Sequence, residues 1–115
     1  MNTEILKATV SRLTNQPKGI LAADESSPTC DKRFQALGIE TTEENRRAYR
    51  ELLITAPEVE KYISGFILYD ETIRQSTKTG TPFTTAMKAK GVDIGIKVDG
   101  GLLDHVYAQG ALREG

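Results

Sequence analysis

Three short runs of apolar residues along the chain predict β-strands. They span residues 19–24, 62–69 and 94–98, and acidic residues end or follow each run. The first run lacks polar alternation, which is typical of a strand buried on both faces of a parallel sheet. Helical patterns separate the runs, and the order strand, helix, strand, helix, strand favours parallel βαβ units in an α/β fold.

Helices are expected before and between these strands. Apolar residues recur on one face of residues 5–13, and a short helix is expected over residues 26–38. Thr41 and Glu44 have the spacing of a capping box, so the next helix should begin there. A further short helix is expected over residues 83–90. The helix that follows the capping box has an apolar stripe of Ala48, Tyr49, Leu52, Leu53 and Ala56.

Alternation along the third strand separates its charged and aliphatic residues. Lys97 shares a face with Gly95 and Asp99. An ammonium on a covered face must be paired or must reach a water-filled cavity, because burying it alone is costly. The alternative is a strand-end lysine that simply reaches solvent. The residues expected to pack against helices are Ile94, Ile96 and Val98.

Asp24 occupies the matching position at the carboxyl end of the first strand. Ligands of parallel α/β sheets bind at this edge of the sheet. We therefore expect the carboxylate of Asp24 and the ammonium of Lys97 to meet across one pocket, where each stabilises the other's charge. Such a pair suits proton transfer and the polarisation of a hydroxyl or carbonyl group. The alternative is that Asp24 and Glu25 are solvated turn residues.

Residues of the helices that follow are candidates for binding phosphate. Ser26 and Thr29 lie at the start of a helix, where an anion is favoured. Lys32 and Arg33 follow one turn later, and an arginine offers two parallel hydrogen bonds to phosphate. Arg46 in the next helix is a further candidate. The alternative for the basic residues is a solvated helix face.

Composition limits the classes of function. The 115 residues fit one small domain, and a formal charge of -1 supplies no basic field for nucleic acid or an anionic membrane. No apolar stretch suits a signal peptide or a membrane span. Single Cys30 and single His105 argue against a disulfide and a zinc site. Asp70 and Glu71 are expected to be ordinary strand-end carboxylates, so no metal or cofactor is predicted.

Five stretches form an ordered set of motifs. They are residues 18–26 (KGILAADES), 32–33 (KR), 42–50 (TEENRRAYR), 62–72 (YISGFILYDET) and 95–99 (GIKVD). Their order and approximate spacing resemble those of class I fructose-bisphosphate aldolases, over about residues 15–103. Residues 27–30 and 56–65 resemble the bacterial and plant-type branch more than the animal branch.

The resemblance implies a TIM (β/α)8 barrel whose first three strands are those predicted above. It implies reversible cleavage of fructose 1,6-bisphosphate to dihydroxyacetone phosphate and glyceraldehyde 3-phosphate, in glycolysis and gluconeogenesis. A lysine Schiff base performs this reaction without a metal. It also implies a cytoplasmic enzyme that is often a homotetramer. By this resemblance, Asp24 orients substrate hydroxyls and the Schiff-base lysine, and Lys97 supports the surrounding charge network. The matching phosphate-side residues are Ser26, Thr29, Lys32 and Arg33, with Arg46 as a further candidate.

The sequence also departs from the family pattern. The family's Schiff-base lysine, acid/base glutamate and second phosphate site belong to later strands, and a complete barrel takes about 250 residues. Gly100 stands where the family usually has a lysine, and residues 104–115 match no motif. We therefore expect residues 1–103 to be the amino-terminal part of an incomplete aldolase barrel, inactive alone. The alternative is a non-enzymatic βαβ module that binds a sugar phosphate or another protein.

Overall fold

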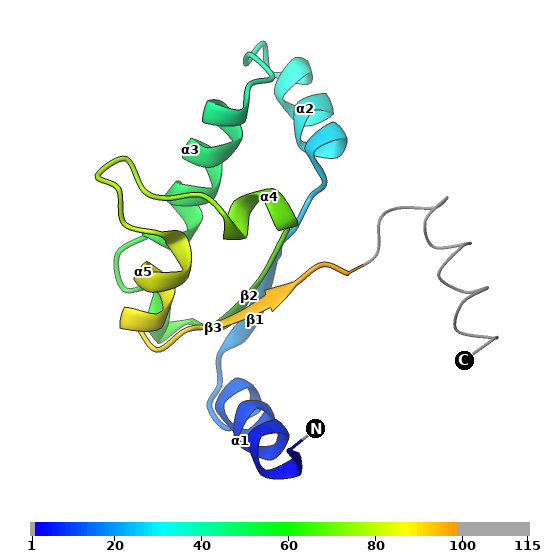
Figure 1. Cartoon of the computed structure of the whole chain (residues 1–115). Coiled ribbons are helices and arrows are strands. Elements are labelled where there is room, and N and C mark those ends of the chain that lie inside the picture. The colour runs from blue at the N-terminus through cyan, green and yellow to red at the C-terminus, as the bar shows by residue number, and fades with distance from the viewer. Residues whose placement is uncertain (1, 99–115) are drawn as a thin grey trace, which may run out of the picture.

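The three predicted strands form one parallel sheet (Figure 1). The structure is a computed structural model that describes residues 2–98. Strand β1 spans Gly19–Ala23, β2 spans Ile63–Leu68 and β3 spans Asp93–Ile96. Their spatial order is β1-β2-β3, so β2 is the central strand. The prediction of a parallel βαβαβ unit is confirmed.

Helices precede β1 and fill both connections between strands. Their bounds are Thr3–Thr14 for α1, Ser27–Ala36 for α2, Glu43–Ile54 for α3, Asp70–Ile73 for α4 and Phe83–Ala89 for α5, with a 3-10 turn at Val59–Lys61. Helix α3 is capped by Thr42, whose hydroxyl accepts a hydrogen bond from the Asn45 amide at 3.0 Å. The capping box expected at Thr41 and Glu44 is therefore wrong by one residue.

Alternate residues of the strands form a core with the helices on one side of the sheet. Phe66 and Leu68 of β2 are at most 1% exposed, and Ala23 of β1 belongs to the same cluster. Figure 1 shows α3 to α5 beside the sheet, whereas α2 lies beyond its carboxyl end. The other buried members of the core are Ile54, Val59, Phe83, Met87 and Val92.

The opposite side of the sheet, here called the open face, is largely uncovered by the described residues. Helix α1 reaches its amino end, where Arg12 pairs with Asp93 at 3.0 Å. Leu13 packs over Gly65, where a Cβ atom would lie 2.8 Å from Leu13 Cδ2. Glycine at this position therefore permits the close approach of α1. The strand register places residues in rows: Ile20, Gly65 and Asp93 form one, and Ala22, Ile67 and Gly95 form the next.

The buried face of α3 differs from the predicted stripe. Arg50 and Ile54 are its buried residues, whereas Leu52 is 73% exposed. Positions 50 and 54 are four residues apart and therefore lie on one helix face. The expected stripe is wrong at Leu52, because this residue is two positions from both Arg50 and Ile54 and therefore points to the opposite side of the helix.

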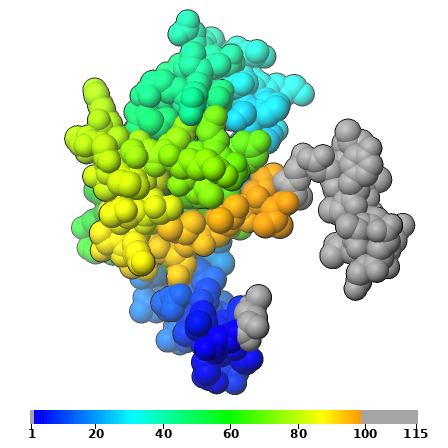
Figure 2. Space-filling model, viewed as in Figure 1, coloured from blue at the N-terminus to red at the C-terminus, as the bar shows by residue number. Residues whose placement is uncertain are grey.

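The aliphatic face of β3 is covered only in part. Ile94 packs against the core as expected. Ile96 and Val98 are 49% and 94% exposed, because among residues 2–98 no helix follows β3. Figure 2 shows the orange β3 segment on the surface of the molecule. The expectation that all three side chains pack against helices is wrong for the last two.

We expect the isolated 115-residue chain to self-associate through the open face and the outer edges of β1 and β3. Ile20 is half exposed on that face, so Ile20→Lys should weaken the association. Leu52→Lys is the matched control on the outer face of α3. Size-exclusion chromatography with light scattering measures the mass. A 12.6 kDa monomer that unfolds cooperatively would contradict this expectation and favour an autonomous module.

Candidate active site

The candidate site lies at the carboxyl ends of the strands. Leu68 of β2 pairs with Ala23 on one side and with Ile96 on the other. The Lys97 amide donates to the Leu68 carbonyl at 2.9 Å, which continues the ladder. The next residue of each strand therefore belongs to a third row of the open face. This row consists of Asp24, Tyr69 and Lys97.

Asp24 and Lys97 approach each other across this row. Lys97 Nζ lies 3.9 Å from Asp24 Oδ2, and the two side chains are 24% and 26% exposed for Lys97 and Asp24 respectively. Because β2 separates their strands, their backbones are about 10 Å apart. The long lysine side chain spans this distance. The predicted approach of the two charges is confirmed, and both groups keep access to solvent. That they face one substrate pocket stays a prediction.

The turn after Asp24 leads directly into α2. Ser26 caps this helix: its hydroxyl accepts the Thr29 amide at 3.4 Å and donates to the Thr29 hydroxyl at 3.1 Å. Lys32 and Arg33 lie one turn further along and are exposed. Positions 29, 32 and 33 share a helix face. The four predicted phosphate-side residues therefore lie together, Ser26 as the cap and the other three within α2, which begins three residues after Asp24.

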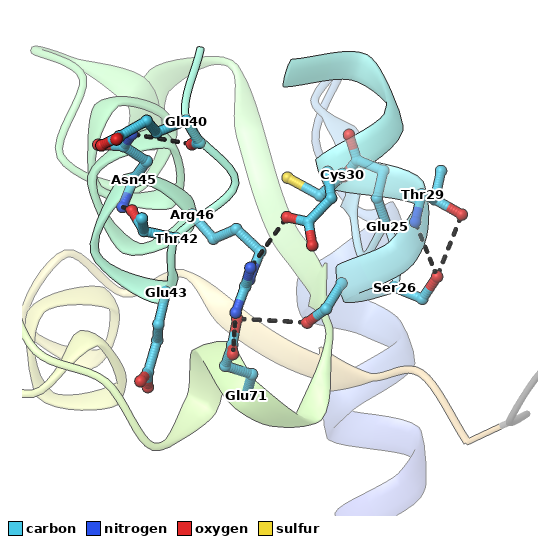
Figure 3. A network of polar contacts seen from close by, with 12 residues as sticks. Glu25, Ser26, Thr29, Cys30, Glu40, Thr42, Glu43, Asn45, Arg46 and Glu71 are labelled. Atoms are coloured by element: carbon cyan, nitrogen blue, oxygen red, sulfur yellow. Dashed lines mark hydrogen bonds and ion pairs between the residues drawn. The ribbon is translucent and has the colours of Figure 1, made fainter. Parts of the chain in front are cut away.

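Arg46 of α3 belongs to a network of carboxylates (Figure 3). Its Nε and Nη2 donate to the two carboxylate oxygens of Glu71 at 2.8 and 3.0 Å, and its Nη1 donates to Asp31 at 2.9 Å. The hydrogen bonds to Glu71, and then those to Asp31, raise the pKa of Arg46 despite its partial burial. The network ties α2, α3 and α4 together. The predicted contact of Arg46 with phosphate stays a prediction.

A second polar cluster adjoins Asp24 and was not predicted from the sequence. Its centre is Glu25, and we call Glu25, Arg33, Tyr49 and Arg50 the Glu25 cluster. Arg33 Nη1 and the Tyr49 hydroxyl donate to Glu25 Oε2 at 2.7 and 2.9 Å. Arg50 Nη2 donates to the Glu25 carbonyl at 2.6 Å, and its Nη1 lies 3.7 Å from Glu25 Oε1. The cluster joins the turn after β1 to both α2 and α3.

The surroundings of Glu25 lower its pKa. Burial would raise this pKa, but hydrogen bonds from the Glu25 backbone and Tyr49, with the charges of Arg50 and Arg33, outweigh burial. Burial, followed by the hydrogen bond to Glu25, raises the pKa of Tyr49. At neutral pH the cluster therefore holds a carboxylate beside a protonated phenol.

The other candidate residues of the sequence have no ligand-binding geometry within the described part of the chain. Asp70 pairs with Arg74 at 3.0 Å on the surface. Burial raises the pKa of Cys30, as suits an unreactive helix residue. Among residues 2–98, no group of three or more His, Cys, Asp or Glu side chains could hold a metal ion. The positions that lie outside the described residues are Asp99, Gly100, His105 and the tail 104–115.

Most of the chain matches one family of enzymes. Residues 5–112 match the family model described as fructose-bisphosphate aldolase class-I. The chain belongs to this family. The match includes residues 104–112, a segment in which no aldolase motif was expected from the sequence.

Individual aldolases are similar to this chain over most of its length. A probable fructose-bisphosphate aldolase class 1 of Xylella fastidiosa is 56% identical over 101 residues, which are 88% of this chain and 30% of the relative. A chloroplastic fructose-bisphosphate aldolase 1 of Chlamydomonas reinhardtii is 53% identical over 100 residues, which are 87% of this chain and 26% of the relative. The chain therefore spans less than a third of the length of either relative.

A solved aldolase structure has the same arrangement of strands and helices. The fructose-bisphosphate aldolase of Plasmodium falciparum, solved in complex with TRAP and a small-molecule inhibitor, matches with a TM-score of 0.82 at 44% identity. The match covers 86% of this chain and 28% of that chain. The α/β architecture with three parallel strands is thus the one that this aldolase contains.

We expect the Glu25 cluster to stabilise the fold near neutral pH and to lose this contribution in acid. The folded-state pKa of Glu25 lies below its unfolded-state value of about 4.3, so the stabilisation is present above that value and disappears as the pH falls through the folded-state pKa. Glu25→Gln should lower the thermal midpoint at about pH 6, and the difference from the unsubstituted chain should shrink toward about pH 3.

Circular dichroism melts of the 115-residue chain carrying Ile20→Lys, which should weaken its self-association, measure this difference. Glu58→Gln is the control, because Glu58 pairs with Lys61 at 2.9 Å on the surface and both side chains are exposed. A Glu25→Gln effect that is independent of pH would contradict the expectation.

Proposed function

We propose that residues 1–103 supply the first three strands of a class I fructose-bisphosphate aldolase barrel, with Asp24 and Lys97 facing the substrate. The approach of these two groups to 3.9 Å at the strand ends is the observation that carries this proposal. Catalytic residues of (β/α)8 barrels lie at the same end of their strands. Family membership motivates the reaction, cleavage of fructose 1,6-bisphosphate to dihydroxyacetone phosphate and glyceraldehyde 3-phosphate in glycolysis and gluconeogenesis.

Opposite charges on the open face suit an aldol cleavage. The Asp24 carboxylate can accept hydrogen bonds from substrate hydroxyls. The Lys97 ammonium can stabilise negative charge that develops on oxygen. Cleavage also needs a lysine that condenses with the ketone, because the resulting iminium accepts the electron pair of the broken carbon–carbon bond. We assign that lysine, the acid/base glutamate and a second phosphate site to later strands of a complete barrel.

The start of α2 is the proposed phosphate side of the site. Ser26 and Thr29 supply hydroxyl groups at the helix amino end, and Lys32 and Arg33 supply charge. Arg33 is 65% exposed although one of its nitrogens donates to Glu25, so its guanidinium remains accessible to a ligand. Arg46 would have to exchange one of its carboxylate partners for phosphate in order to take part.

The aldolase relatives do not favour the non-enzymatic module. We propose a cytoplasmic enzyme that forms homo-oligomers and uses no metal or cofactor, with a chloroplast as the alternative location because one relative is named as chloroplastic. Within residues 2–98, none of the helices has the length and apolar character needed to cross a membrane. The proposed ligand is a phosphorylated ketose, and neither nucleic acid nor a membrane is a proposed partner.

The 115-residue chain by itself should form no Schiff base. Incubation with dihydroxyacetone phosphate and sodium borohydride should leave its mass unchanged, because the proposed Schiff-base lysine belongs to a later strand. The full-length Chlamydomonas aldolase, treated in the same way, is the positive control. A stable adduct on Lys97 would overturn the assignment of the reactive lysine to a later strand.

A grafted aldolase tests the site within a complete barrel. In this protein, the 100 aligned residues of the Chlamydomonas enzyme are replaced by those of our chain. It should cleave fructose 1,6-bisphosphate, and Asp24→Asn or Lys97→Met should each lower kcat/KM by about 100-fold, since each removes a charge that contacts the substrate.

The matched controls for the grafted aldolase are Glu58→Gln and Lys61→Met. These residues form a surface ion pair and should change kcat/KM by less than about twofold. Loss of activity on grafting would contradict the proposed function. An active graft that tolerates both Asp24→Asn and Lys97→Met would contradict the proposed site.

A further inference from the structure

We propose that Arg50 is a positioning residue that holds the turn carrying Asp24 against α3. The inference rests on the proposed function, in which Asp24 faces the substrate. Arg50 is 2% exposed, and its Nη2 donates to the Glu25 carbonyl at 2.6 Å. This carbonyl belongs to the peptide that joins Glu25 to Ser26. One hydrogen bond therefore restrains the backbone between the carboxylate of Asp24 and the cap of α2.

The burial of Arg50 is made possible by its neighbours. A buried guanidinium without a partner is costly, and the Glu25 carboxylate supplies the opposite charge at 3.7 Å. The Tyr49 ring lies beside it, with 5.2 Å between Arg50 Cζ and the ring centroid. Phe34 of α2 packs edge-on against Tyr49 with 6.0 Å between the ring centroids. The guanidinium of Arg50 thus lies between the Tyr49 ring and the turn after β1.

The same cluster also reaches the proposed phosphate side. Glu25 Oε2 accepts the hydrogen bond from Arg33 Nη1 at 2.7 Å, and the Arg33 side chain is otherwise exposed. Glu25 is therefore bonded through its carbonyl to buried Arg50 and through its carboxylate to Arg33. A shift of Arg50 would displace both the Asp24 turn and the anchor of Arg33. Arg50 and Glu25 therefore position both proposed ligand-binding groups, the Asp24 carboxylate and the Arg33 guanidinium.

The hydrogen bonding of Arg50 differs from that of Arg46. Each guanidinium nitrogen of Arg46 donates to a carboxylate. In the Glu25 cluster, by contrast, Arg50 Nε and Glu25 Oε1 are buried without a hydrogen bond from the described residues. Unsatisfied buried groups cost stability. Among the described residues, the oxygen that accepts a hydrogen bond from Arg50 is the Glu25 backbone carbonyl, so this bond restrains the turn itself.

Steady-state kinetics of the grafted aldolase test this role. Arg50→Met should lower kcat by about tenfold or more, because Asp24 is displaced, and should also raise KM, because the anchor of Arg33 on the proposed phosphate side shifts with the turn. Arg50→Lys should restore part of kcat, since its ammonium can donate to the Glu25 carbonyl. Arg74→Met is the control, because it removes a surface pair with Asp70. A folded Arg50→Met enzyme with unchanged kcat would overturn the proposal.

Hydrogen exchange provides a readout that does not depend on activity. In the 115-residue chain carrying Ile20→Lys, which should weaken self-association, Arg50→Met should accelerate exchange of the amides at residues 24–27 and 29 by about tenfold and leave those of β2 unchanged. Equal acceleration in β2 would show a merely structural role and would overturn the proposal.

If Arg50→Met fails to fold, Tyr49→Phe removes one bond to Glu25 and should accelerate the same amides to a smaller extent. If the grafted aldolase without further substitutions is inactive, the proposed function is contradicted. The exchange experiment still tests the role of Arg50, because it does not depend on activity.

Discussion

Parallel pairing of β1 and β3 to β2 sets the level at which every residue lies along the sheet. Side chains alternate between the two faces, so a shift of one residue in any strand would move its whole set to the other face. With the observed register, Phe66 and Leu68 face the helices, whereas Asp24 and Lys97 face the open side. The core and the candidate site are therefore two consequences of the same register.

The covered face of the sheet contributes the apolar core, whereas the open face carries the proposed site. Apolar contacts with α3 and α5 are concentrated on the covered face. On the open face, the amino ends of the strands contact α1, and the carboxyl ends carry the row of Asp24, Tyr69 and Lys97. Lys97 must cross β2 to approach Asp24, so the pair depends on all three strands. A stable core on one side allows a charged, partly exposed row on the other.

Polar tertiary contacts complete the arrangement at the carboxyl edge. Arg46 joins α2, α3 and α4 through Asp31 and Glu71. The Glu25 cluster joins the turn after β1 to α2 and α3. Both arginines come from the motif of residues 42–50, yet their hydrogen bonding differs. The motif therefore contributes two separate sets of contacts, those of Arg46 and those of Arg50, to the sheet edge that carries the proposed substrate-binding residues.

Local pattern in the sequence predicts the strands and the face on which each residue lies, because strand alternation is a short-range property. The meeting of Asp24 with Lys97 follows only when the parallel order of the strands is added, since the carboxyl ends of parallel strands lie at one edge of the sheet. Local pattern does not predict the burial of Arg50, whose partner Glu25 is 25 residues away in the chain. A charged residue four positions before Ile54 was the available signal, but helix periodicity alone favoured Leu52. The exposure of Ile96 likewise depends on which helix covers the strand, which no pattern within β3 reveals.

A double-mutant cycle in the grafted aldolase tests most directly whether residues 24 and 97 act as a pair. The cycle compares kcat/KM for the two single variants and for the combined Asp24→Asn/Lys97→Met variant. We expect the combined variant to lose little more activity than the more impaired single variant, because either change already breaks the shared site. Losses that simply multiply would show two independent groups and would contradict the account.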